Sequence, residues 1–71
     1  MRVNVSNLSS LIDKKYRGNQ SFFAEEAEID RCYLNQLLNG KIDSNSPKIC
    51  NKIIRYCEKN NLNYKDFIFL E

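Results

Sequence analysis

The sequence predicts an all-α fold of five short helices in a single domain that spans residues 1–71. Two observations lead to this class: apolar residues recur at three- and four-residue intervals, and capping or stop residues bound most of these runs. The length supports one small core, because a domain of this size buries only about 60% of the surface of its unfolded chain. We therefore expect marginal stability alone, which a partner would improve.

The first helix is expected to begin after Ser6 or Asn7 as its N-cap and to run to about Tyr16. Gly18 is the predicted stop, since glycine is favoured just after a helix. The inner stripe of this helix is predicted to be Leu8, Leu11 and Ile12, with Tyr16 at its end.

Residues 19–40 read as a helix, a four-residue turn and a second helix. Asn19 and Asp30 are N-cap candidates because their side-chain oxygens can accept from free backbone N–H groups, and Gly40 is the stop. The inward positions are Phe23, Ala24, Ala27, Leu34, Leu37 and Leu38, with Ile29 in the turn. Two short helices joined this tightly cross at a steep angle, which is the helix-turn-helix arrangement, here at about residues 20–39.

The remainder is predicted to be a polar loop at residues 40–46 and two further helices. Ser46 caps the first of them with Pro47 at its first position, and Asn60–Asn61 ends it. Its apolar face is formed by Ile49, Ile53, Ile54 and Cys57. Asn63 is expected to cap a last short helix that carries Phe67 and Ile68; the alternative for residues 67–71 is a short strand, since their side chains alternate.

Composition excludes several classes of function. No apolar run approaches the ~20 residues that span a membrane, and the N-terminal segment lacks a secretion signal's apolar stretch, so we expect a cytoplasmic protein. Three cysteines without histidine or a C-x-x-C pair give no metal site, and Cys57 is expected in the core. No cofactor loop or catalytic carboxylate pair is present, so no enzyme is expected.

The motif residues resemble those of a known family. The residues that carry the resemblance are Asn19-Gln20, Phe23-Ala24, Ala27, Ile29, Leu34, Leu37 and Asn39-Gly40. They are similar to the helix-turn-helix of the phage Cro and repressor family. Downstream matches are Ser46-Pro47, Ile49, Ile53, Leu62-Asn63 and Phe67-Ile68, so the resemblance covers roughly residues 7–69.

The resemblance implies a regulator of the lysis–lysogeny switch in a bacterial host. The family's base-reading positions fall on Arg31, Cys32 and Gln36, with Tyr33 beside them, and Arg and Gln suit guanine and adenine. Phosphate-contact candidates are Gln20, Asn39, Lys41 and Lys48. The family's turn commonly has glycine where this chain has Glu28, so a left-handed backbone there would strain the residue by ~1 kcal/mol.

Charge is distributed unevenly along the chain. Residues 20–40 carry one base against four acids, a net of −3, whereas residues 1–19 and 41–71 carry net charges of +3 and +2. The acids are Glu25, Glu26, Glu28 and Asp30. Because DNA affinity depends on neutralised phosphates, an acidic motif favours a protein partner over DNA.

Two functions follow as expectations. The leading one resembles the modulators of repression of temperate phages: an antirepressor whose surface of Arg31, Tyr33, Gln36 and the four acids binds the DNA-binding domain of the cognate repressor and occludes its operator contacts. The alternative is a Cro-like operator-binding repressor. A weak homodimer through Phe67, Phe69 and Leu70 is also possible, and Cys32 is expected to be the most readily alkylated thiol.

Overall fold

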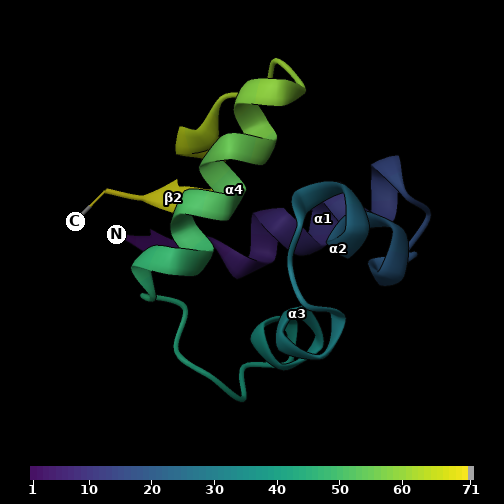
Figure 1. The fold of residues 1–71 in the computed structure, drawn as a ribbon, viewed down its shortest axis with the longest axis horizontal. Helices are drawn as coiled ribbons and strands as arrows, with labels where there is room; N and C mark the ends of the chain where they lie inside the picture. Colours follow the sequence, from purple (N-terminus) through teal and green to yellow (C-terminus); the bar gives the residue numbers. More distant parts are fainter. Residues whose placement is uncertain (71) are drawn as a thin grey trace.

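The computed structural model describes residues 1–70 and is mostly helical (Figure 1). The elements are, in chain order, β1 Arg2–Val3, α1 Val5–Lys15, α2 Gln20–Ala27, α3 Arg31–Leu38, α4 Pro47–Lys59, a 3₁₀ turn η1 Tyr64–Asp66, and β2 Ile68–Phe69. The described residues therefore form four α-helices and a two-stranded sheet. The mostly helical class is confirmed, whereas the count of five helices is wrong.

Within residues 1–70, no helix combines the length and apolar character needed to cross a membrane.

The predicted caps of α2 and α3 are confirmed. The Asn19 side-chain oxygen accepts from the Phe22 N–H at 3.1 Å, and the Asp30 carboxylate accepts from the Tyr33 N–H at 3.0 Å. Gly40 follows α3 with a φ of +71°, as a stop residue does. The turn between the two helices is residues 28–30, one residue shorter than predicted, and Glu28 has a left-handed backbone with φ 57°.

The predicted start of α1 is wrong. The helix begins at Val5, and its N-cap is Asn4, whose side-chain oxygen accepts from the Asn7 N–H at 3.1 Å. The Asn7 side chain instead donates to the Asp66 carbonyl at 2.7 Å, which ties α1 to η1. The N-cap therefore lies two or three residues earlier than predicted, and the Asn7 side chain contacts η1 instead of capping the helix.

The predicted fifth helix is also wrong. Asn63 does act as a cap, accepting from the Lys65 N–H at 3.0 Å, but only the 3₁₀ turn η1 follows it. Phe67 and Ile68 lie outside any helix, because β2 pairs antiparallel with β1, Val3 opposite Ile68. The strand alternative is therefore confirmed for residues 68–69, and Glu71 of that tail lies outside the described residues.

The four α-helices and both strands contribute buried residues to the core. Its largest fully buried side chains are Tyr56, Phe23, Leu8, Ile12, Leu34, Leu37, Ile53 and Ile68. Cys50 and Cys57 are buried among them, as expected for Cys57. The Tyr56 and Tyr16 hydroxyls form a hydrogen bond, which satisfies the only polar atom of the Tyr56 side chain. This core fixes which sides of α2, α3 and α4 face outward.

Candidate functional site

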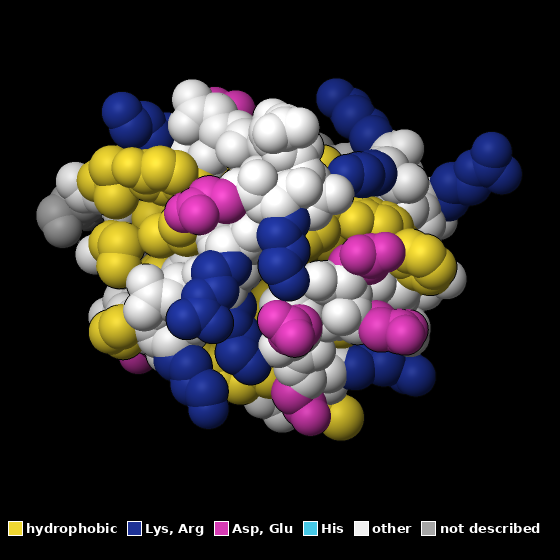
Figure 2. Space-filling view, turned by 45° about the horizontal axis from the view of Figure 1, so that its top comes forward, with side chains coloured by type: hydrophobic (Ala, Val, Ile, Leu, Met, Phe, Trp, Pro, Cys, Tyr) yellow, Lys and Arg dark blue, Asp and Glu magenta, His cyan; other side chains and the backbone are white. Residues whose placement is uncertain are grey.

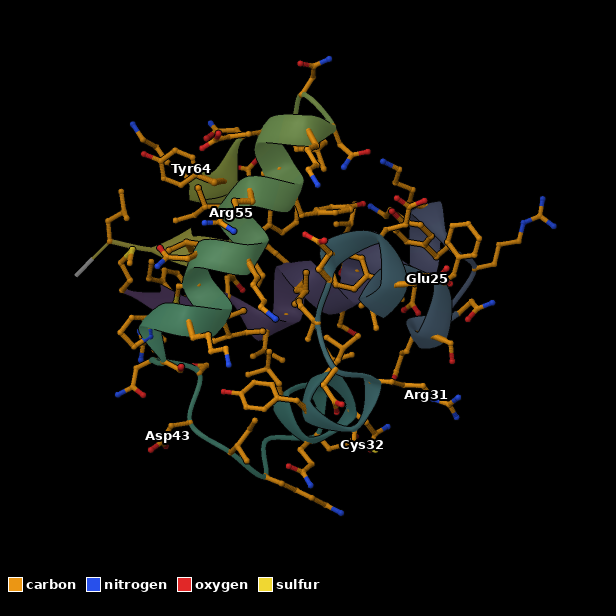
Figure 3. All side chains as sticks on the ribbon, viewed as in Figure 1. Glu25, Arg31, Cys32, Asp43, Arg55 and Tyr64 are labelled. Atoms are coloured by element: carbon orange, nitrogen blue, oxygen red, sulfur yellow. The ribbon has the colours of Figure 1, made fainter. Side chains whose placement is uncertain are left out.

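A polar groove runs between the start of α2 and the outer side of α3. The predicted residues that line it are Gln20, Arg31, Cys32, Gln36 and Lys41, joined by Gly18, Asn19, Ser21 and Asn35. Figure 3 shows Arg31 and Cys32 pointing outward from α3. None of these lining residues carries a carboxylate, so the groove is neutral to basic although the motif as a whole is acidic. We refer to it as the α3 groove.

A chain of side-chain amides crosses the α3 groove. The Asn35 amide N–H donates to the Gln20 side-chain oxygen at 3.3 Å, and the Asn39 amide N–H donates to the Asn35 side-chain oxygen at 3.1 Å. Sequence reasoning missed Asn35, although its position four residues after Arg31 and four before Asn39 puts all three on one side of α3. These hydrogen bonds link two predicted phosphate contacts, Gln20 and Asn39, although Asn39 itself does not line the α3 groove.

The helix α2 carries a separate acidic surface. Glu25, Glu26 and Glu28 line a depression with Phe22 and with Lys59 of α4. We call this set, without Lys59, the α2 acidic surface. Phe22 is 51% exposed, and its ring centroid lies 5.5 Å from that of Tyr16. Sequence reasoning missed Phe22; the signal was the adjacent pair, because a one-sided helix buries only one of two neighbouring phenylalanines.

Asp30, Tyr33 and Lys48 belong to a third surface, separate from the α3 groove and the α2 acidic surface. They line an apolar pocket between the α2–α3 turn and the start of α4. The other lining residues are Ile29, Ser46, Ile49 and Lys52. The structure therefore does not bring Tyr33 and the acids together with Arg31 and Gln36; the predicted residues divide among the α3 groove, the α2 acidic surface and this α3–α4 pocket.

The polar contacts between Glu28 and α4 lie at the surface. Lys59 lies 3.9 Å from the Glu28 carboxylate, with both side chains at least two-thirds exposed, so this ion pair contributes little. Lys52 donates to the Glu28 backbone carbonyl at 2.7 Å. Most of the acidic surface is thus available to a partner.

The three thiols differ in exposure. Cys32 is exposed, whereas burial raises the pKa of the Cys50 and Cys57 thiols above their ordinary value. In the part of the chain that the structure describes, no three Cys, Asp or Glu side chains gather where they would hold a metal ion.

An apolar patch lies at the chain ends. Phe69 and Leu70 are 40% and 55% exposed, next to an exposed Met1, and the Arg2 guanidinium lies 5.0 Å from the centre of the Phe69 ring. Phe67 is only 8% exposed, so its predicted part in a homodimer is wrong: it belongs to the core.

Comparison of the whole chain with protein-family models, with curated proteins and with solved structures finds no match.

Proposed function

We propose that this chain is an antirepressor of a phage-type genetic switch, built on a Cro/repressor-type helix-turn-helix domain. In this proposal the α2 acidic surface docks on the DNA-binding domain of the cognate repressor and occludes its operator contacts. The observation that carries the proposal is the half-exposed ring of Phe22 beside Glu25, Glu26 and Glu28. The helical class and the tight α2–α3 turn are consistent with such a domain.

The chemistry of this surface suits a cationic protein face. A DNA-binding surface presents Lys and Arg to phosphates, and carboxylates compete for the same side chains. Exposed ion pairs alone are weak, so the complex needs an apolar anchor that loses water on binding. Phe22 supplies that anchor because its ring is half exposed and lines the same depression as the three acids.

The test uses fluorescence anisotropy of labelled switch-region DNA, titrated with the repressor and then with this protein. We expect the repressor to leave the DNA, and we expect Phe22→Ala to abolish that displacement. Phe69→Ala is the matched control, since it removes another exposed phenylalanine, which lies on β2 and not on α2. Displacement that survives Phe22→Ala unchanged contradicts the proposal.

Charge reversal gives a second arm of the same test. Glu25→Lys/Glu26→Lys should weaken displacement, whereas Asp13→Lys/Asp43→Lys adds the same charge at two exposed positions elsewhere and should not. Equal loss in both variants would indicate a general charge effect and count against docking through α2.

Operator binding is the second candidate function, and the α3 groove favours it. The groove holds Arg31 and Gln36 for bases and Gln20 and Lys41 for phosphates, with no carboxylate among its lining residues. Direct binding of operator DNA by this protein alone, falling steeply with salt, would support it. Arg31→Ala should then relax base preference at one position, while Lys41→Ala should weaken all sequences alike.

A further inference from the structure

The cations of α4 form one stripe. Lys48, Lys52, Arg55 and Lys59 follow one another at intervals of four, three and four residues, which places them within about 60° of arc over about 16 Å of helix. Within residues 1–70, the side chains of Lys48 and Arg55 make no hydrogen bond or ion pair. These two charges are therefore free to meet a partner.

The stripe and the α2 acidic surface share one face of the molecule, with opposite charge at its two ends. Figure 2 shows basic and acidic side chains side by side on that face, and Figure 3 shows Arg55 on α4 and Glu25 on α2. The acidic end adjoins Lys59, at the end of α4, and includes the half-exposed ring of Phe22. The basic end adjoins Lys48, at the start of α4.

The basic end also carries a hollow. The α3–α4 pocket is lined there by the apolar side chains of Ile29, Tyr33 and Ile49, together with the cations Lys48 and Lys52 and one acid, Asp30. The face therefore has an acidic end with a half-exposed ring and a net basic end with an apolar pocket.

We propose that a second copy of this chain docks on this face about a two-fold axis that crosses α4 near its middle. The two α4 helices are then antiparallel. Rotation by half a turn sets the acidic end of each copy over the basic end of the other, and brings Phe22 toward the partner's α3–α4 pocket. A two-fold interface requires such a self-complementary surface.

Charge complementarity favours a second copy over a nucleic acid. Glu26 and Glu28 line a pocket together with Lys52, Arg55 and Lys59, so a duplex laid along the stripe would meet carboxylates well within a Debye length of about 8 Å. A partner that carries both charges fits this face better than a nucleic acid does.

The inference goes beyond the proposed function and is tested without a repressor. Because self-association and repressor docking would both use the α2 acidic surface, the two are mutually exclusive.

The experiment is sedimentation velocity over a range of protein concentrations at low and high salt. We expect the average mass to rise toward that of a dimer at low salt and to return to the monomer's at high salt, because the contacts are exposed charges. A wild-type protein that stays monomeric at millimolar concentration in low salt overturns the proposal.

Charge-swapped variants provide the decisive arm. Glu25→Lys/Glu26→Lys makes both ends of the face basic, and Lys48→Glu/Arg55→Glu makes both ends acidic; all four positions are exposed. Each variant alone should be monomeric, while their equimolar mixture should form a heterodimer. A mixture that does not associate overturns the proposal.

Matched controls separate the face from net charge. Lys14→Glu/Lys65→Glu and Asp13→Lys/Asp43→Lys make the same charge changes at exposed positions outside the face, and both should self-associate as the wild type does. Circular dichroism checks that every variant is folded. If the charge-swapped variants still self-associate and the substitution Leu70→Ala abolishes self-association, the apolar patch at the chain ends is the interface and the proposal is wrong.

Discussion

Glu28 holds a backbone conformation that a side chain disfavours. It caps α2 with φ 57° and ψ 40°, where a residue with a Cβ is strained by about 1 kcal/mol and glycine is not. We predict that Glu28→Gly is more stable than Glu28→Ala by about 1 kcal/mol, measured by urea denaturation. Both variants lose the exposed pair with Lys59, so the comparison isolates the backbone. A less stable glycine variant would contradict this account.

The buried thiols make stability depend on pH in the alkaline range. Burial raises the pKa of Cys50 and Cys57 above the ordinary value of 9.0. The unfolded chain therefore loses these protons first, so their stabilising contribution is complete below pH 9.0 and is lost as the pH rises through the folded pKa. Tyr56 acts in the same sense, because burial and then the Tyr16 hydrogen bond raise its pKa.

We predict that the free energy of unfolding falls as the pH rises above about 9, measured from urea midpoints. Cys50→Ala/Cys57→Ala should flatten this dependence even though the cavities lower stability at neutral pH. Cys32→Ser, at an exposed thiol, should leave the slope unchanged. Identical slopes in all three proteins would show that the buried thiols do not titrate in this range.

At the scale of the element, α1 depends on a cap that precedes the predicted one. The Asn4 side chain accepts from the Asn7 N–H, and losing such a bond costs about 1 kcal/mol. We predict that Asn4→Ala lowers the free energy of unfolding by about that amount, while Ser6→Ala, at an exposed residue inside the helix, changes it little. Thermal denaturation of the two variants shows whether Asn4 or Ser6 caps the helix. A larger loss of stability in Ser6→Ala would support the start of the helix that the sequence predicts.

The elements that could be predicted are those with local signals. Asn19, Asp30 and Pro47 mark starts of helices within one turn of the chain, so α2, α3 and α4 followed from sequence. The sheet did not, because β2 forms only where β1 from the other end of the chain supplies hydrogen bonds. The predicted site residues lie on three separate surfaces for a similar reason. The packing of α2 and α3 in the core decides which acids face the same side, and spacing along the chain does not.

At the scale of the whole molecule, the two ends of the chain close the fold. The Asn4 N–H donates to the Phe67 carbonyl at 2.7 Å, the Val3 N–H donates to the Ser44 carbonyl at 2.8 Å, and β1 packs against α4 (Figure 1). Phe67 and Ile68, near the described end, therefore belong to the core, and we expect them to unfold together with the helices.

Two neighbouring residues of β2 test this closure. Ile68 is 1% exposed and packs in the core, whereas Phe69 is 40% exposed on the opposite side of the strand. We predict that Ile68→Ala lowers the free energy of unfolding by about 3 kcal/mol, a large part of the total for so small a domain, because it leaves a cavity. Phe69→Ala should cost less than about 1 kcal/mol despite removing more atoms. Urea denaturation measures both. Equal effects of the two substitutions would mean that the strand lies on the surface and that the helices fold without it. Loss of the cooperative unfolding transition in Ile68→Ala alone would show that the fold requires the paired strands β1 and β2.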